Sequence, residues 1–273
     1  EHGGPEKHEI VAFRNGFHGR TFGALAATDR PGYQEPFKPL IPGVRFCEVG
    51  SLEGVAEVVG RERTAAVIIE PIQAEGGVLP VPAEFLRALR EICDRENALL
   101  IFDEVQVGLG RTGTLWAYEA SGVEPDIMTL AKPLAGGLPM GAVLVREHVA
   151  SAIQPGDHAT TFGGGPLVAT AALAVCRRVG DPEFLRTVRE KGEFLAKALG
   201  ALALRREKIR AVRGAGLIWA IELTSPAGDV VSAALEEKLL LVAAGPNVVR
   251  LVPPLTISLD ELKTGLSILE RVL

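Results

Sequence analysis

Short apolar runs recur along the first two-thirds of the chain, separated by segments with helical periodicity. Several runs are rich in Val, Ile and Leu, which is typical of strands buried on both faces of a mostly parallel sheet. The clearest helix is expected at residues 82–97, where apolar residues form one stripe and charged residues lie away from it. This alternation predicts an α/β fold. We expect strands at residues 9–13, 44–49, 65–70, 98–103, 126–131 and 141–145.

The last third of the chain has a different pattern. Asp181 before Pro182 is a turn signal with Asp in the N-cap position of a helix. We therefore predict two domains, a large one at residues 1–180 and a smaller α+β domain at 181–273. In the smaller domain we expect helices at 183–204, 231–241 and 259–273, and strands at 215–223 and 248–252.

Composition narrows the class of protein. The 273 residues are 47% hydrophobic, which excludes a disordered chain. The apolar runs are far shorter than the ~20 residues that cross a bilayer, so no membrane is expected as a partner. With 29 basic and 34 acidic residues and no basic block, nucleic acid is not expected either. Three widely spaced cysteines indicate a reducing compartment, the cytoplasm by default or a plastid if the source is a plant.

The first feature that indicates chemistry is an apolar strand that ends in Asp103 and Glu104. In an open α/β sheet the carboxyl ends of strands face the ligand crevice, where a carboxylate can pair with a cation or a protonated ring nitrogen. The alternative is that Asp103 only caps the following turn. The spacing alone favours neither interpretation.

The second feature is Lys132, which directly follows a strand-like segment and precedes a loop with two glycines. An amine in a crevice loses hydration, and this favours the neutral form that attacks a carbonyl to give a Schiff base. For an isolated lysine in such a position, a solvent-facing loop residue is the commoner case.

The third feature is a loop in which Thr160 and Thr161 precede three glycines and an expected helix. Hydroxyls and backbone N–H groups there could donate to a phosphate, although an ordinary Gly-rich turn has the same pattern. Together the three features match the parts that a pyridoxal phosphate (PLP) enzyme requires. His18 and His158 are expected to be local structural histidines, and no spacing indicates a metal site.

Six stretches, in order along the chain, resemble the class III (subgroup II) aminotransferases of fold type I, most closely the acetylornithine aminotransferase branch. The resemblance implies a mostly parallel large domain and a smaller α+β carboxyl-terminal domain. It covers the whole chain, but we expect that the family's amino-terminal portion, with its Ser/Gly-Thr-Glu phosphate loop, is missing. The stretches are residues 15–21, 70–77, 102–106 with 110–113, 129–137, 160–164 and 247–254.

The resemblance implies roles around the cofactor. Lys132 would be the Schiff-base lysine and the base that moves the substrate proton. Asp103 would pair with the pyridinium nitrogen, and Gln106 would contact the phenolic oxygen of the ring. Phe17 would stack on the ring face, and Glu70 would support the surroundings of Asp103.

The resemblance also implies how substrates and a second subunit are bound. Arg20 would clamp the substrate α-carboxylate. Arg250 would bind the α-carboxylate of glutamate or 2-oxoglutarate, and Glu75 would neutralise it when the ω-amino substrate is present. A plain structural ion pair is the alternative for these two residues. Thr161, with Thr160, would bind the cofactor phosphate across a homodimer interface.

We therefore expect a PLP-dependent transaminase of arginine biosynthesis that moves the ω-amino group of N-acetylornithine to 2-oxoglutarate in a ping-pong reaction. The alternative amino donors are succinylornithine, ornithine and 4-aminobutyrate, whose enzymes share these motifs. A different class is a truncated, non-catalytic homologue that acts only as a dimerisation module. Lys132 together with Asp103 is the feature that separates these classes, because a chain freed from catalysis need not keep both.

Overall fold

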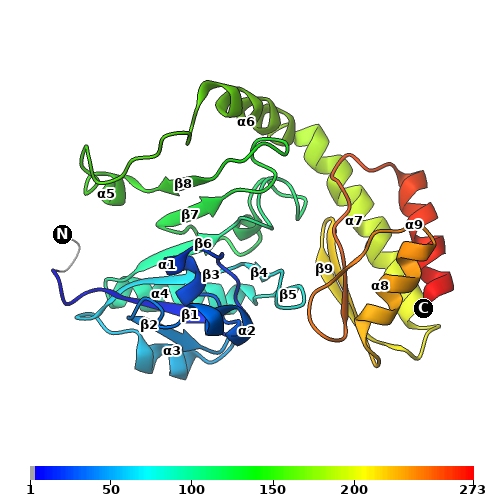
Figure 1. The fold of residues 1–273 in the computed structure, drawn as a ribbon, viewed down its shortest axis with the longest axis horizontal. Coiled ribbons are helices and arrows are strands. Elements are labelled where there is room, and N and C mark those ends of the chain that lie inside the picture. Colours follow the sequence, from blue (N-terminus) through cyan, green and yellow to red (C-terminus); the bar gives the residue numbers. More distant parts are fainter. Residues whose placement is uncertain (1–3) are drawn as a thin grey trace. The chain divides into compact units, whose positions relative to one another are not determined.

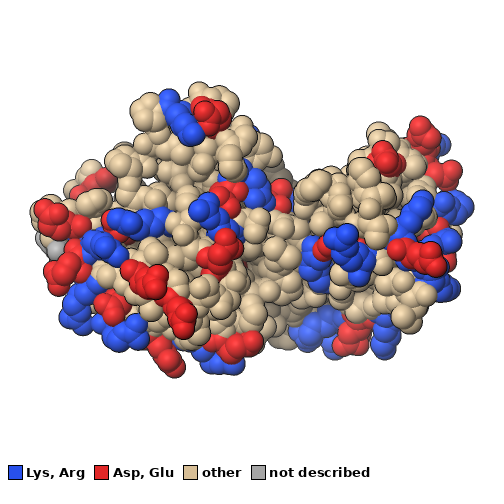
Figure 2. Space-filling model, turned by 90° about the horizontal axis from the view of Figure 1, so that it is seen from below, with Lys and Arg blue, Asp and Glu red and all other residues tan. Residues whose placement is uncertain are grey.

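A computed structural model describes residues 4–273, which separate into two compact units (Figure 1). The large unit comprises the chain up to Pro71, Val81–Gln106 and Tyr118–Arg177. The small unit comprises the remaining segments, Ile72–Pro80, Val107–Ala117 and Arg178–Leu273. Basic and acidic side chains are intermixed over the face seen in Figure 2. No helix in the described part of the chain is long and apolar enough to span a bilayer.

The large unit contains a six-stranded sheet in the order β2-β1-β3-β6-β7-β8. Its strands are β1 (Glu9–Phe13), β2 (Val44–Cys47), β3 (Thr64–Ile69), β6 (Leu99–Asp103), β7 (Ile127–Leu130) and β8 (Ala142–Val145). All neighbouring pairs are parallel except β7 and β8, so the predicted mostly parallel α/β sheet is confirmed.

The chain up to residue 179 also contains helices. They are α1 (Phe22–Ala26), α2 (Pro31–Gln34), α3 (Leu52–Val58), α4 (Ala83–Arg95), α5 (Glu147–Ala150) and α6 (Pro166–Val179), with 3₁₀ turns η1 (Glu35–Phe37) and η2 (Ala117–Ala120). The predicted stripe of α4 packs on the sheet, where the rings of Phe85 and Phe13 meet edge to face at 5.7 Å. Each such buried side chain contributes about 1.5–3 kcal/mol to folding.

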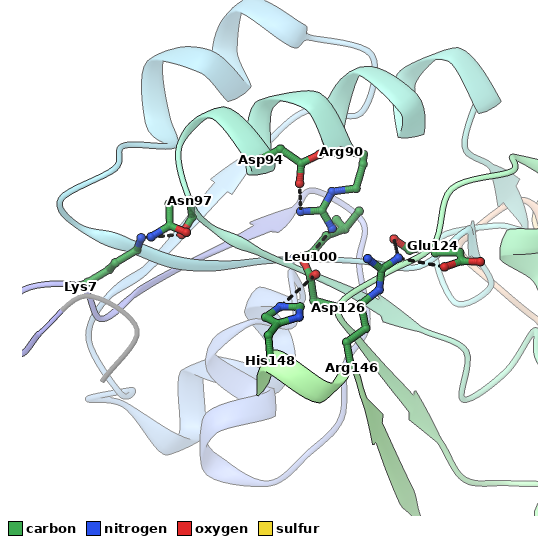
Figure 3. Close-up of polar contacts among 9 residues, drawn as sticks. All are labelled: Lys7, Arg90, Asp94, Asn97, Leu100, Glu124, Asp126, Arg146 and His148. Carbon is green, nitrogen blue, oxygen red and sulfur yellow. Dashed lines mark hydrogen bonds and ion pairs between the residues drawn. The ribbon is translucent and has the colours of Figure 1, made fainter. Parts of the chain in front are cut away.

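Asp126 joins four elements at the amino end of β7 (Figure 3). Its Oδ2 accepts hydrogen bonds from the backbone N–H of Leu100 in β6 at 2.8 Å and from Nη1 of Arg90 in α4 at 2.7 Å. The backbone carbonyl of Asp126 accepts a hydrogen bond from the backbone N–H of Arg146, which follows β8, and Nε2 of His148 lies 3.4 Å from Oδ1 of Asp126. Burial alone lowers the pKa of Arg90, but the hydrogen bond and charge of Asp126 raise it above its usual value. This buried ion pair therefore helps to fix β6 and β7 beside each other.

The small unit is built on a four-stranded antiparallel sheet in the order β11-β12-β10-β9. Alternate residues of β10 face opposite sides, as the strand period requires. Ile221 and Leu223 pack with the three helices, whereas Ile218 and Ala220 pack with the hairpin β4–β5. The strands are β4 (Ile72–Gln73), β5 (Leu79–Pro80), β9 (Ile209–Ala215), β10 (Ile218–Leu223), β11 (Val242–Ala243) and β12 (Val248–Leu251), and the helices are α7 (Pro182–Ala203), α8 (Ala227–Glu236) and α9 (Leu259–Val272).

The sequence pattern differs from the small unit in three places. The expected strand at 215–223 is β10, which begins at Ile218, and a further strand, β9, precedes it across a tight turn in which Gly216 has φ +50°. The expected helix at 231–241 lies earlier, and Lys238, at φ +65°, follows its end. The units are also not the two continuous ranges 1–180 and 181–273, because the hairpin at 72–80 buries Ile72, Ala74 and Val78 in the small unit.

Candidate functional site

The ends of two neighbouring strands bring the candidate acid and amine to one edge of the large-unit sheet. Asp103 is the last residue of β6, and its register partner Thr129 lies in the parallel strand β7. The N–H of Glu104 donates to the carbonyl of Thr129 at 3.0 Å, so the strand ends stay paired. Lys132 follows the last residue of β7, Leu130, by one intervening residue. Because both strands point the same way, Asp103 and Lys132 lie at their carboxyl ends.

The Asp103 carboxylate is buried and held by two partners. The residue is 5% exposed, and its Oδ1 accepts a hydrogen bond from the N–H of Val105 at 3.0 Å. Nδ1 of His18 lies 2.8 Å from Oδ2, a distance at which a ring N–H donates to a carboxylate. The backbone N–H of His18 in turn donates to Oγ1 of the buried Thr28 at 2.9 Å. These contacts hold a carboxylate in a position shielded from water, where it can stabilise a nearby cation.

His18 is the functional neighbour that sequence reasoning missed. It was expected to be a local structural histidine, but its partner Asp103 is distant in sequence. The available signal was its place directly after Phe17, within a stretch already assigned to the cofactor. Among the residues described by the structure, no group of His, Cys, Asp or Glu could hold a metal ion.

Glu70 and Phe17 shape the same edge of the sheet. Oε1 of Glu70, which is 3% exposed, accepts a hydrogen bond from the backbone N–H of Phe17 at 2.8 Å. The ring of Phe17 meets the ring of Tyr33 edge to face, and the guanidinium carbon of Arg20 lies 3.6 Å from the centre of that Tyr33 ring. Glu70 thus supports the segment that carries His18 to Asp103, and Arg20 is held over an aromatic face.

Lys132 has an unusual backbone conformation. It is exposed and has φ +22°, which is uncommon for a residue other than glycine. Backbone strain of this kind costs on the order of 1–3 kcal/mol and is concentrated at functional sites. The turn that follows is closed by hydrogen bonds from Leu134 to Ala131 and from Gly136 to Pro133. Gln106 is half-buried, just beyond Asp103 in the chain.

Thr160 and Thr161 lie in an exposed loop. Oγ1 of Thr160 accepts a hydrogen bond from the N–H of Gly163 at 3.2 Å, which forms a local turn. Among the described residues, no hydrogen bond joins Thr160 or Thr161 to Asp103 or Lys132.

Arg250 and Glu75 form a pair within the small unit. Arg250 lies in β12 and is 8% exposed, and Glu75 lies in the turn between β4 and β5. Nη1 of Arg250 donates to Oε1 of Glu75 at 2.8 Å and to the carbonyl of Ala74 at 3.0 Å. The Glu75 side chain is 30% exposed, so water can reach it. The pair therefore joins a buried cation to an accessible anion on a short turn.

The side chains of the large unit fit the chemistry of the predicted cofactor. Asp103 offers a buried anion to a protonated ring nitrogen, and Lys132 offers an amine at the neighbouring strand end. Phe17 offers an aromatic face, and the Thr160 and Thr161 hydroxyls can donate to phosphate oxygens. A cofactor that combines a pyridine ring, an aldehyde and a phosphate uses each of these groups.

Comparison with known proteins agrees with this chemistry. The family described as aminotransferase class-III matches residues 1–273. The mitochondrial acetylornithine aminotransferase of Alnus glutinosa is 53% identical over 97% of this chain, which spans 59% of that protein.

Solved structures give the same result. The ornithine aminotransferase of Toxoplasma gondii ME49 matches with a TM-score of 0.93 and 31% identity, covering 98% of this chain and 65% of that one. The N-acetylornithine aminotransferase of Stenotrophomonas maltophilia K279a matches with a TM-score of 0.82 and 33% identity, covering 98% and 66%.

Proposed function

Because the chain belongs to the class III aminotransferase family, we propose that it is part of a PLP-dependent transaminase. The reaction moves the ω-amino group of N-acetylornithine to 2-oxoglutarate, giving N-acetylglutamate semialdehyde and glutamate, a step of arginine biosynthesis. The observation that carries the proposal is the position of Asp103 and Lys132 at the carboxyl ends of neighbouring parallel strands. The choice of amino donor rests on the name of the Alnus relative.

The residues of the large unit have distinct tasks in this proposal. PLP, when bound, supplies a carbonyl for the amino group and a ring that withdraws electrons from the reacting carbon. Asp103 keeps a proton on the ring nitrogen, and His18 holds the Asp103 carboxylate in place. Lys132 would take the proton from the substrate carbon and deliver it to the cofactor carbon that carries the aldehyde in free PLP. Phe17 packs on the ring face and Gln106 contacts the phenolic oxygen.

Three further residues are proposed to support or bind substrate. Glu70 fixes Phe17 through the backbone hydrogen bond described above. Arg20 binds the α-carboxylate of the amino donor, a task suited to a guanidinium held by an aromatic ring. Arg250 binds the α-carboxylate of glutamate or 2-oxoglutarate.

Glu75 is proposed to act as the counter-ion of Arg250 when the ω-amino substrate brings no carboxylate to it. Its 2.8 Å contact with Arg250 and its partly exposed side chain support an ion pair that can open. A pocket with such a pair can accept two unlike substrates in turn.

A homodimer is proposed because the large unit exposes apolar side chains in one part of the sequence. Phe162 is 89% exposed, Leu167 74% and Val143 64%, so large apolar side chains of this segment are available to a partner. Phe162 directly follows Thr160 and Thr161, so a partner that covers it would also approach their hydroxyls. We propose that these threonines bind the phosphate of the partner subunit's cofactor.

The donor preference decides the substrate. N-acetylornithine, succinylornithine, ornithine and 4-aminobutyrate are compared in turn with 2-oxoglutarate as acceptor, and N-acetylornithine is expected to give the highest kcat/KM. The Toxoplasma structure, an ornithine aminotransferase, makes ornithine the main competitor. A preference of roughly tenfold for unacetylated ornithine, about 1.4 kcal/mol, would reject the proposed donor.

The compartment stays a proposal. All three cysteines are free thiols, which supports the cytoplasm or another reducing compartment. The names of relatives include mitochondrial forms and bacterial proteins, so the names leave the compartment open.

A further inference from the structure

A second arginine contacts the turn that carries Glu75. Arg213 lies in β9, and its Nε donates a hydrogen bond to the carbonyl of Gly77 at 2.9 Å. Gly77 is two residues beyond Glu75 in the five-residue turn between β4 and β5. The turn is therefore held at both ends, by Arg250 at Ala74 and Glu75 and by Arg213 at Gly77.

Strand register explains why both arginines reach the same turn. Ala220 in β10 pairs with Arg213 on one side and with Arg250 on the other. Residues that pair across neighbouring strands project from the same face of the sheet, so the two side chains flank Ala220. Ala220 is fully buried in the cluster that also contains Ala74 and Val78 of the turn.

Glu222 orients the Arg213 guanidinium. Its Oε2 accepts a hydrogen bond from Nη1 of Arg213 at 2.6 Å, so one planar group binds the carboxylate and the Gly77 carbonyl together. Gly77 has φ +107°, and a Cβ there would lie 3.2 Å from Nη2 of Arg213. The positive φ favours glycine at this position, and a Cβ there would crowd the Arg213 guanidinium.

We propose that Arg213 is a positioning residue for substrate specificity, which holds the Glu75 carboxylate at Arg250 by fixing the Gly77 end of the turn. This inference rests on the proposed function of the Glu75–Arg250 pair. Without the tether, the turn moves more freely and Glu75 spends less time at Arg250. The amino donor then meets an uncompensated cation, whereas 2-oxoglutarate meets a guanidinium that is easier to reach.

The test compares Arg213→Gln with Arg210→Gln in the holoenzyme. Arg210 lies in the same strand and contacts the same Glu222 at 3.2 Å, but it is exposed and no contact joins it to the turn among the described residues. Single-turnover rates are measured separately for the amino donor and for 2-oxoglutarate. Hydrogen–deuterium exchange of the peptide at 72–80 reports the turn independently of activity.

In Arg213→Gln we expect exchange of that peptide to rise roughly tenfold, the effect of losing one charged hydrogen bond. We expect kcat/KM for the amino donor to fall by a similar factor, with the value for 2-oxoglutarate unchanged or higher. Arg210→Gln is expected to match the parent protein in both measurements. Arg213→Lys keeps the charge toward Glu222 and is expected to shift the ratio in the same direction if Arg213→Gln folds poorly.

An equal loss of rate in both half-reactions would overturn the role of Arg213. So would an unchanged ratio of the two rates together with unchanged exchange. Either result would leave the proposed function of the enzyme intact. A parent enzyme that transfers no amino group would instead refute the proposed function, and the specificity role with it. A ratio that moves equally in Arg210→Gln would assign the effect to Glu222 and so contradict the tether.

Discussion

Single side chains in this protein are oriented by partners that are distant in sequence. Asp103 and Lys132 were predicted from strand ends and motif order, because the carboxyl edge of a parallel sheet collects such groups. The place of His18 beside Phe17 indicates nearness to the site, but its contact with Asp103 does not follow from the sequence, because it depends on how the Phe17 segment folds over the sheet. Nor does spacing reveal the positive φ of Lys132, which is a backbone property.

Replacement of Lys132 tests the chemistry at this scale. Lys132→Ala is expected to lower kcat by at least about 10²–10⁴-fold, the usual contribution of a positioned acid–base group. The parent protein should also retain PLP covalently after borohydride reduction, and mass spectrometry should locate it at Lys132. Lys38→Ala, in which a lysine paired with Glu35 on the surface is removed, is the matched control and should behave as the parent. Equal PLP retention by Lys132→Ala would contradict the assignment and favour the non-catalytic class.

At the level of elements, buried parallel strands were the easiest to predict. The predicted strand 9–13 coincides with β1, and the closing helix with α9 to within one residue. The strand β9 was missed because Arg210 and Arg213 interrupt its apolar residues, so the segment resembles an exposed one. Assignment of the hairpin β4–β5 to the small unit could not be predicted, because it depends on contacts with Ile218 and Ala220 from a remote strand.

The pairing of β9 with β10 predicts a pH-dependent stability. The hydrogen bond and charge of Arg213, followed by those of Arg210, lower the pKa of Glu222 below its usual 4.5. The unfolded chain therefore binds this proton at a higher pH than the folded chain does. The contribution is fully present well above pH 4.5 and is lost as pH falls through the lowered folded pKa.

Urea unfolding of the parent and of Glu222→Gln measures this contribution. At pH 7 the variant should be less stable by about 0.5–1 kcal/mol, the range for a partly exposed ion pair. Near pH 3 the difference should shrink toward zero. A difference of the same size at both pH values would show that the lost stability does not come from the charge of Glu222.

For the whole molecule, the family match and the sheet topology agree on the fold. Exposed side chains on the surface are what indicates how subunits assemble. Acidic and basic groups are intermixed on the face in Figure 2, and the net charge is only −5. The apolar exceptions around Phe162 and Leu167 were not predicted, because a sequence does not show which apolar residues remain uncovered.

The homodimer is tested by charge substitution in this exposed apolar segment. Leu167→Asp is expected to raise the dimer Kd roughly a hundredfold, because a two-fold interface loses about 1.5 kcal/mol at each of its two copies. Sedimentation velocity over a concentration series measures the change. Leu240→Asp changes a residue of the small unit that is 82% exposed, and it should leave the Kd unaltered. An unchanged Kd for Leu167→Asp would place the interface elsewhere or exclude the dimer.

The Asp126 ion pair has a consequence for how this fold can change. It joins β6 and β7 at their amino ends, whereas Asp103 and Lys132 are at the opposite ends of the same strands. The groups that hold these strands together are thus spatially separate from those assigned to the reaction. Loops at the carboxyl ends of the strands can therefore change in sequence, and the enzyme can accept new substrates, while the contacts at the amino ends keep β6 and β7 paired. Directed evolution of new amine specificity should therefore leave Arg90 and Asp126 untouched and vary the other end.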